Sequence, residues 1–197
     1  MKFCAIDIET TGLDPHQHGV IEFAAVYADL AGTFEPKTFH RFIIPINMMW
    51  DFYCLKLHSA LIQEIDQLAA AKDPSVVGSL DKVALQFKHW LHAECGVPLS
   101  TKNIRTDDKL VLERVTAAGK NFGSFDLQFL LHGTKEFGSS FRHRSLDPVM
   151  LYTSPDDTIP LDLAGCKLRA GLVPKVAHRA LQDCWDVVDL LQTKFKQ

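Results

Sequence analysis

The pattern of hydrophobic and polar positions divides the chain into an early strand-rich part and a later helical part. Residues 3–9, 19–28 and 38–45 are rich in β-branched and aromatic side chains and are separated by turn-like segments, which predicts three strands. Because the links are short, we expect an antiparallel meander. The period then changes to that of helices at residues 58–72 and 79–95, the second with Ser79 as its N-cap.

The second half of the chain is less regular. We expect a loop over 96–108, one or two strands over 109–119, and mostly helices after them, punctuated by proline and glycine. Strands followed by helices around a mixed sheet indicate an α/β or α+β sandwich. A chain of 197 residues with 47% hydrophobic side chains can fill one core, so a single domain over residues 1–197 is expected.

The first predicted strand carries two acids on one face. In CAIDIETTGL, residues 4–13, Asp7 and Glu9 are two positions apart, so both side chains leave the same side of the strand. They would stand about 7 Å apart and, at an effective dielectric constant of about 20, would repel each other by about 2 kcal/mol. A positive charge is therefore expected between them.

The last predicted helix places another acid on its apolar face. Asp183 shares an arc with Val187 and Leu190, and the solvent-facing stripe is expected to consist of Gln182, Asp186, Asp189 and Thr193. A lone buried carboxylate is unfavourable, so Asp183 requires a cation or a dense shell of hydrogen bonds. A structural salt bridge would also satisfy it.

A fourth acid begins the helix predicted in NFGSFDLQFLL, residues 121–131. Asp126 shares a face with Phe129 and Leu130, although an acid in a first helical turn is also favoured by the helix dipole. Four carboxylates that converge without a matching buried base require divalent cations, and oxygen-rich sites suit Mg²⁺ or Mn²⁺.

His178 is a candidate because of its spacing from Asp183. The two residues are five positions apart, about 140° around an ideal helix, so they can face one point only if His178 lies in the loop before the helix. There it would be placed to remove a proton from a water near neutral pH, and otherwise it would be an ordinary surface residue. We expect no comparable role for the other eight of the nine histidines.

Charge and cysteine content narrow the class of protein. The formal charge of −3 is divided into −5 over residues 1–100 and +2 over residues 101–197, so phosphate contacts should come mainly from the second half. The five cysteines are odd in number and include no CxxC pair, which favours reduced thiols in a cytosolic protein and argues against zinc. The sequence has neither a signal-peptide pattern nor a membrane-spanning apolar run.

Three segments together resemble a known family. DIETTG, NFGSFDLQFL and HRALQD match, in order and spacing, the motif blocks of the DnaQ-like DEDDh 3′-to-5′ exonucleases, from Asp7 to Asp183. This resemblance implies a ribonuclease H-like fold, with a mixed sheet whose first three strands are antiparallel and which is flanked by helices. A bacterial or phage origin would suit so compact a chain.

The resemblance also implies two-metal hydrolysis of phosphodiesters to nucleoside 5′-monophosphates. Position by position, Asp7, Glu9, Asp126 and Asp183 match the acids that hold two Mg²⁺ ions, which Mn²⁺ should replace, and His178 matches the general base. Candidates for binding the terminal nucleotide of a single-stranded DNA or RNA 3′ end are Thr10, Thr11, Leu13, Asn121 and Phe125. The acid at Asp147 is interpreted as a helix cap before Pro148.

The substrate class is open at this point. Trp50 lies in a segment, residues 48–61, that loosely resembles oligoribonuclease, and it would stack on a base or pack in the core. Arg142 and Arg144 would contact phosphates or form an ordinary solvated surface. Single-stranded DNA is the favoured substrate and short RNA is the alternative. A polymerase-associated subunit, a homo-oligomer and a catalytically silent nucleic-acid-binding module are further alternatives.

Overall fold

A twisted five-stranded sheet forms the centre of the computed structural model, which describes residues 1–44, 48–100 and 111–196. The first three strands are β1 (Lys2–Thr10), β2 (Val20–Asp29) and β3 (Lys37–Ile43), and they pair as an antiparallel meander. Two short parallel strands, β4 (Val76–Val77) and β5 (Ala117–Ala118), complete the order β4-β3-β2-β1-β5. This mixed sheet, with its first three strands antiparallel, has the strand arrangement that was predicted.

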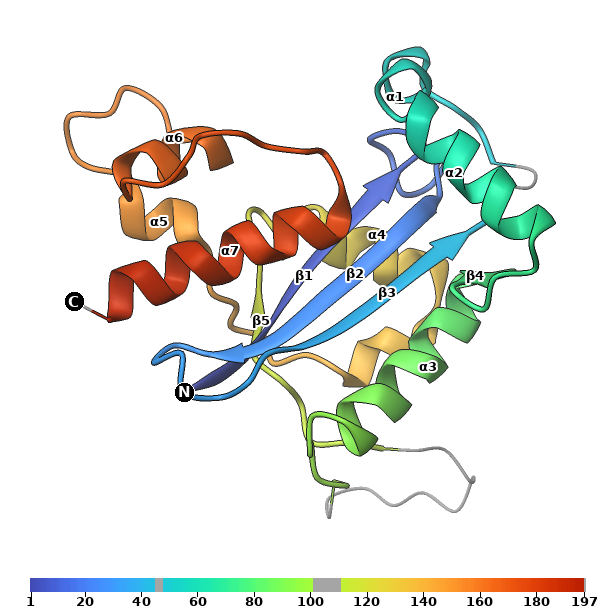
Figure 1. Ribbon diagram of the computed structural model, residues 1–197, viewed down its shortest axis with the longest axis horizontal. Helices are drawn as coiled ribbons and strands as arrows, with labels where there is room; N and C mark the ends of the chain where they lie inside the picture. Colours follow the sequence, from blue (N-terminus) through green and yellow to red (C-terminus); the bar gives the residue numbers. More distant parts are fainter. Residues whose placement is uncertain (45–47, 101–110, 197) are drawn as a thin grey trace.

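Helices cover both faces of the sheet (Figure 1). The N-terminal half supplies α1 (Phe52–Leu57), α2 (Ser59–Ala70) and α3 (Leu80–Ala93). The C-terminal half supplies α4 (Asp126–Gly133), the 3-10 helix η1 (Lys135–Ser139), α5 (Pro148–Tyr152), α6 (Leu163–Arg169) and α7 (Ala180–Phe195). No described helix combines the length and apolar composition that a membrane crossing needs.

The alternation of side chains along β1 separates two hydrophobic cores. Cys4, Ile6 and Ile8 pack with the side chains of α3, α4 and η1, whereas Phe3 and Ala5 pack with those of α5, α6 and α7. Asp7 and Glu9 continue the second set, so they leave the sheet on the side of α7 at the point where β1 ends. A third, smaller cluster joins α2 to the sheet through Ile21, Phe42, Leu61 and Ile65.

Most boundaries of the predicted elements lie within two residues of the observed ones. The helix predicted over 58–72 spans Ser59–Ala70 and follows the short helix α1, which the pattern did not indicate; Ser79 caps α3 by accepting a hydrogen bond from the amide of Lys82. The loop predicted over 96–108 and the start of the strand predicted at 109 lie mostly outside the described residues. Of the segment 109–119, Ala117 and Ala118 form a strand.

The predicted solvent stripe of the last helix is wrong at Asp186. That residue is 4% exposed and pairs with the buried Lys167 of α6 at 2.6 Å from Nζ to Oδ2. The helix periodicity alone cannot reveal this pair, because α6 covers this side of α7 and brings the cation from 19 residues upstream. The buried arc that holds Asp183, Val187 and Leu190 is as predicted.

The aromatic cluster around Phe87 should dominate the stability of the α3 side. Phe87 is fully buried, and its ring centroid lies 5.4 Å from that of Phe23 and 5.7 Å from that of Trp90. We expect Phe87→Ala to lower the free energy of unfolding by about 3–5 kcal/mol, because the cavity is too enclosed to collapse. The Leu85 side chain on the same helix is 47% exposed, so Leu85→Ala should change the free energy of unfolding by less than about 0.5 kcal/mol. Urea denaturation of both variants measures these changes. Equal losses in the two variants would contradict this account of the core.

Candidate metal centre and active site

Three acids meet where β1 ends and α7 begins. Asp7 and Glu9 lie near the C-terminal end of β1. Asp183 lies in the first turn of α7, which packs across β1 and β2. One carboxylate oxygen of each residue lies within 4.8 Å of the other two. The pairing of β1 with β2 shifts register between Glu9 and Thr10, and such bulges redirect side chains next to functional sites.

Asp126 approaches the same strand from the β5 side. Strand β5 pairs with β1 only at Cys4 and Ala5, so the amide of Ile8 lies beyond it and donates instead to Asp126 Oδ1 at 3.2 Å. Asp126 is 3% exposed and stands outside the group of three, but its charge contributes to raising the pKa of Asp7. The fold therefore brings together the four acids that the sequence singled out.

Burial and mutual repulsion make these acids difficult to ionise. Burial and the charge of Glu22 raise the pKa of Glu9 to about 8, and burial raises the pKa of Asp126 to about 7. Burial and the charge of Asp186 raise the pKa of Asp183 to about 6. Burial and then the charge of Asp126 raise the pKa of Asp7 well above its usual value. The cluster accordingly favours binding either protons or cations.

A divalent cation fits this donor set. Asp183 Oδ1 is buried and has no hydrogen-bond partner within the described part of the chain, which is unfavourable for an isolated carboxylate oxygen. The three converging groups offer hard oxygen ligands, with no cysteine among them, as Mg²⁺ and Mn²⁺ require. A bound ion would use the free oxygen of Asp183 and offset the repulsion from Asp7 and Glu9.

His178 lies in the loop before α7, as its spacing predicted. It is exposed, and its charge counts among the influences that lower the pKa of Asp183 and of His58, so it lies close to the acid cluster. Its backbone φ is 50°, in the left-handed region that is unfavourable for side chains with a Cβ. Such strain persists only where the surrounding structure holds the residue in place.

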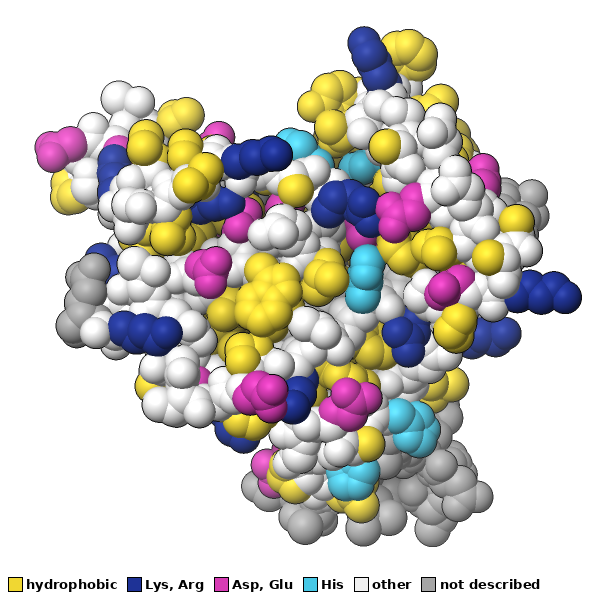
Figure 2. Space-filling model, viewed as in Figure 1, with side chains coloured by type: hydrophobic (Ala, Val, Ile, Leu, Met, Phe, Trp, Pro, Cys, Tyr) yellow, Lys and Arg dark blue, Asp and Glu magenta, His cyan; other side chains and the backbone are white. Residues whose placement is uncertain are grey.

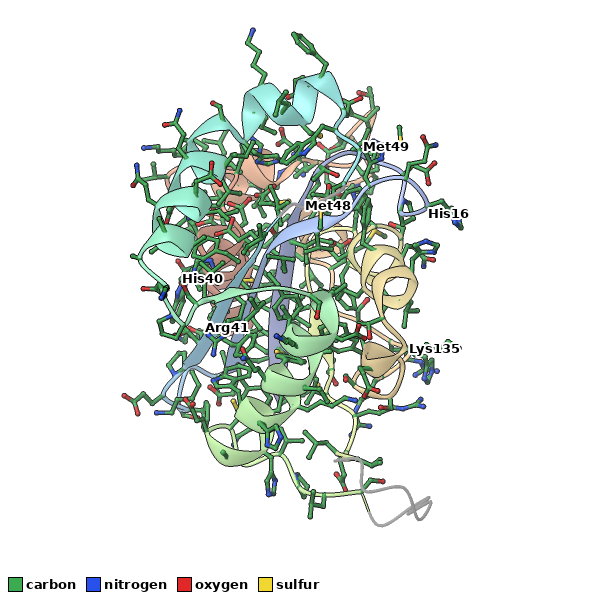
Figure 3. All side chains as sticks on the ribbon, turned by 90° about the vertical axis from the view of Figure 1, so that its right-hand side faces the viewer. His16, His40, Arg41, Met48, Met49 and Lys135 are labelled. Atoms are coloured by element: carbon green, nitrogen blue, oxygen red, sulfur yellow. The ribbon has the colours of Figure 1, made fainter. Side chains whose placement is uncertain are left out.

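A buried carboxylate on β2 holds the start of α7. Glu22 is fully buried, lies opposite Glu9 in the β1–β2 register, and accepts a hydrogen bond from the amide of Ala180, the first residue of α7, at 3.1 Å. His40 Nε2 on β3 lies 2.7 Å from Glu22 Oε1. Figure 3 labels His40 on this strand, next to Arg41. Burial alone would raise the pKa of Glu22, but the hydrogen bond from His40 and the Arg179 guanidinium lower it below the usual value.

Arg179 extends this anchor to a third element. Its guanidinium contacts Glu22 at 3.3 Å and Glu64 of α2 at 2.9 Å. Residues 179 and 180 are thus fixed to β2 and α2, and His178 precedes them directly. We conclude that the buried Glu22 supports the strained backbone of His178.

His58 is a site residue that the sequence interpretation missed. It is 4% exposed at the start of α2, and its Nε2 lies 3.4 Å from Glu9 Oε2. Burial lowers the pKa of His58, which favours the neutral ring. The expectation that no histidine besides His178 has a comparable context is therefore wrong, because the turn between α1 and α2 directs this side chain into the cluster. Its only sequence signal was a polar residue at an apolar helix start.

The side chains of two of the predicted nucleotide-binding residues form hydrogen bonds with the backbone of their own loop. Thr10 and Thr11 are buried; the Thr10 hydroxyl donates to the carbonyl of Gly12 at 2.7 Å, and the Thr11 hydroxyl accepts from the amide of Gly19 at 3.0 Å. The carbonyl of Thr11 also accepts from the amide of Asp51. The loop after Glu9 is thereby tied to the segment that enters α1.

The other candidates differ in exposure. Leu13 is 75% exposed, whereas Trp50 is half-buried and packs against the small α2 cluster, so its core alternative is the one that the structure favours. Phe52 and Tyr53, the next aromatic residues along the chain, are 82% and 69% exposed. Figure 2 shows a hollow between the part carrying α6 and the part carrying α1 and α2, with histidine side chains visible in it.

Asn121 and Phe125 flank Asp126 on the loop before α4. Asn121 is exposed with φ of 58°, and its amide donates to Asp147 Oδ2 at 3.0 Å. Phe125 is half-buried, and its ring centroid lies 5.1 Å from that of Phe129. Asp147 is also the N-cap of α5 and accepts from the amide of Val149, which is the structural role that its sequence context predicted.

Comparison with known proteins identifies the family. The RNase_T family, described as Exonuclease, matches residues 4–191. The chain belongs to this exonuclease family. The resemblance to the DnaQ-like, ribonuclease H-like exonucleases that the three motif blocks carry is thereby confirmed. No curated protein matches the chain.

Solved structures of other nucleases share the fold. E. coli Exonuclease I in complex with a dA16 oligonucleotide is 18% identical, with a TM-score of 0.60 over 98% of this chain and 40% of that one. Exonuclease I from Methylocaldum szegediense is 18% identical, with a TM-score of 0.59 over 98% and 40%. Cell-death related nuclease 4 (CRN-4) is 16% identical, with a TM-score of 0.59 over 97% and 62%. The chain thus spans about 40% of the length of the Exonuclease I chains.

The raised pKa values predict how stability without metal depends on pH. An acid whose pKa is about 7 when folded and about 4 when unfolded binds more protons in the folded state, so its contribution to stability falls as pH rises between these values. Asp126→Asn keeps an oxygen that can accept from the Ile8 amide but removes this titration. In EDTA, we expect the free energy of unfolding of Asp126→Asn to rise relative to that of the unaltered protein from pH 4.5 to 7. A constant difference in urea denaturation would contradict the raised pKa.

Proposed function

We propose that the protein is a metal-dependent 3′-to-5′ exonuclease that hydrolyses single-stranded nucleic acid, preferentially DNA, to nucleoside 5′-monophosphates. One observation carries this proposal: in a chain of the exonuclease family, Asp7, Glu9 and Asp183 each offer a carboxylate oxygen within 4.8 Å of the other two. Asp183 Oδ1 also has no hydrogen-bond partner among the described residues. His178 beside this cluster supplies the proton acceptor that hydrolysis of a phosphodiester needs.

Asp7, Glu9 and Asp183 would hold Mg²⁺, with Asp126 completing a second position from the β5 side. When bound, the ions neutralise charge on the scissile phosphate and lower the pKa of water. Because the acids are reluctant to ionise alone, metal affinity should increase with pH as each acid loses its proton. Mn²⁺, which favours the same oxygen ligands, should replace Mg²⁺.

The side chains themselves orient the reaction. His178, exposed and held by its anchored neighbours, accepts a proton from the attacking water at a ring nitrogen. His58, buried against Glu9, fixes the orientation of that carboxylate. Asp126 is fixed in turn by the amide of Ile8, which limits the rotation of its carboxylate.

Single-stranded DNA is the substrate that we favour. The E. coli Exonuclease I structures hold dA16 and dT13 oligonucleotides. Beside the site, Leu13, Phe52 and Tyr53 expose apolar and aromatic surface on which bases can stack regardless of sequence. Short RNA is the alternative substrate, and Trp50, one of the residues that suggested it, packs partly against the small α2 cluster. Five free, buried cysteines are typical of a reducing compartment such as the cytoplasm.

Hydrolysis of end-labelled oligonucleotides tests the proposal. With 5′-labelled single-stranded DNA and Mg²⁺ or Mn²⁺, we expect a ladder that shortens from the 3′ end and is abolished by EDTA. Asp183→Asn should lower kcat by about 10³-fold because it removes a metal ligand, and His178→Gln should lower it by about 10²- to 10⁴-fold because it removes the proton acceptor.

Asp189→Asn provides a matched control, since Asp189 is an exposed acid of the same helix. It should retain the activity of the unaltered protein. The same assay with RNA of equal sequence determines the sugar preference. Oligonucleotides that are bound but not cut would instead favour a catalytically silent binding module, and shortening from the 5′ end would contradict the proposed direction.

A further inference from the structure

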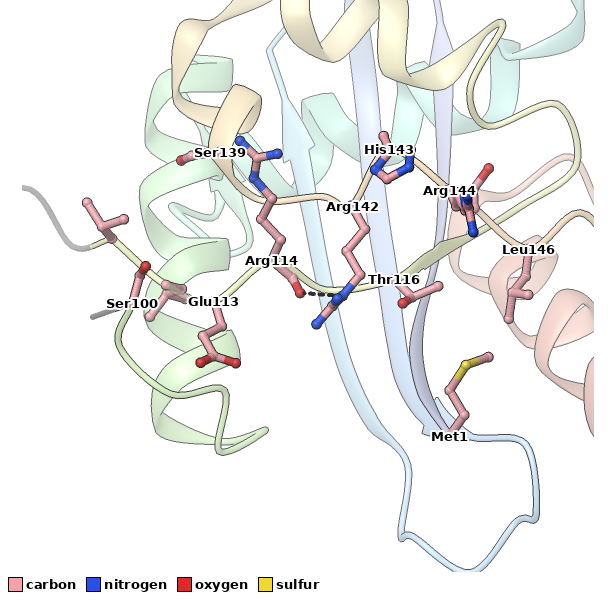
Figure 4. Close-up of a pocket in the computed structure, with 13 residues that line it drawn as sticks. Met1, Ser100, Glu113, Arg114, Thr116, Ser139, Arg142, His143, Arg144 and Leu146 are labelled. Atoms are coloured by element: carbon pink, nitrogen blue, oxygen red, sulfur yellow. Dashed lines mark hydrogen bonds between the residues drawn. The ribbon is translucent and has the colours of Figure 1, made fainter. Parts of the chain in front are cut away.

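A cavity lined by arginines lies at the far end of the sheet from the acid cluster. It has a volume of about 930 Å³ and is lined by Arg114, Arg142, His143 and Arg144 around Thr116 (Figure 4). Among its described lining residues, Glu113 is the one acid. The cavity belongs to the β5 edge, whereas Asp7 and Glu9 lie at the C-terminal end of β1. It is therefore a feature separate from the candidate active site.

The three arginines of this cavity differ from Arg169 and Arg179 in having no acidic partner among the described residues. Within residues 1–44, 48–100 and 111–196, Arg169 pairs with Asp157, and Arg179 pairs with Glu22 and Glu64. Arg114, Arg142 and Arg144 are exposed and make no ion pair in these ranges; Arg142 donates through Nε only to the carbonyl of Arg114. Guanidinium groups that are not neutralised are available for an anion, and their planar donors match phosphate.

The backbone places these cations along a line that leads to the acid cluster. Residues 141–146 run parallel to β5: the amide of Arg142 donates to the carbonyl of Val115, and the amide of Leu146 donates to that of Ala117. Because β5 is itself parallel to β1, the segment runs in the same direction as β1, toward the end of that strand where Asp7 and Glu9 lie. Arg142 is thus level with the start of β1, and Arg144 lies closer to the acids.

Lys120 continues the positive charge at the active-site end of this line. It lies two residues after the end of β5, and its charge is among the influences that lower the pKa of Asp126. From Lys2 to Glu9, β1 rises by about 23 Å at about 3.3 Å per residue. At the stacked spacing of about 3.4 Å per nucleotide, that length corresponds to about seven nucleotides.

We propose that this arginine edge, defined as Arg114, Arg142 and Arg144, is a second binding site for the phosphates of a single strand whose 3′ end occupies the acid cluster. The inference rests on the proposed function, which it deepens: the preferred substrates are strands long enough to reach both sites. The site would recognise charge and not base sequence, because guanidinium groups bind the backbone phosphates, which are the same for every nucleotide.

Steady-state hydrolysis of oligonucleotides of 4 and 20 nucleotides tests this inference with the complete chain and Mn²⁺. The triple variant R114Q/R142Q/R144Q should raise KM for the 20-nucleotide strand by about tenfold, leave kcat unchanged, and leave both constants for the 4-nucleotide strand unchanged. The slope of log KM against log salt concentration for the long strand should fall by about 2, since each phosphate contact on single strands contributes about 0.7.

Lys72→Gln/Lys82→Gln is the control for a general effect of charge. Both lysines are exposed near the opposite, β4 edge of the sheet, and their removal should leave KM for both strands unchanged. An unchanged KM of the triple variant on the long strand, or an equal increase on both strands, would overturn the second site while leaving the exonuclease intact. If the unaltered protein hydrolyses neither strand, the proposed function itself fails.

Discussion

The repulsion between carboxylates at the end of β1 is the constraint around which this structure is arranged. The alternation of β1 fixes Asp7 and Glu9 on one face, and α7 adds Asp183 to them at a separation below 4.8 Å. Burial in the company of like charges raises the pKa of each acid. The site is therefore poorly balanced on its own, and the unpartnered oxygen of Asp183 marks where a cation would relieve the repulsion.

Glu22, on the neighbouring strand β2, is a buried carboxylate whose charge the protein itself stabilises. It is more deeply buried than Asp7 and Glu9, yet His40, Arg179 and the amide of Ala180 surround it, so its pKa is lowered and its charge is retained. Two kinds of acid thus lie opposite each other on one face of the β1–β2 pair. Glu22 is satisfied by the protein and holds α7 in place, whereas Glu9 is left for a ligand.

Local patterns in the sequence were sufficient to predict the meander, α3 with its Ser79 cap, the helix start at Asp126 and the buried position of Asp183. Contacts between distant segments were not predictable in this way. The pair of Lys167 with Asp186 and the contact of His58 with Glu9 join residues that are far apart in the chain. The hydrophobic period within one element does not indicate which distant side chain will pack against it. The packing of Trp50 was likewise not predictable, because the local sequence around an aromatic residue in a loop is the same whether its side chain is packed or exposed.

The central claim is that the acid cluster is a divalent metal site, and anomalous X-ray diffraction from crystals grown with Mn²⁺ tests it most directly. The account predicts an anomalous peak among the oxygens of Asp7, Glu9 and Asp183, with Asp183 Oδ1 as one ligand, and a second peak toward Asp126. Crystals at neutral pH that show no anomalous density there, with the carboxyl groups instead hydrogen-bonded to one another through retained protons, would contradict it.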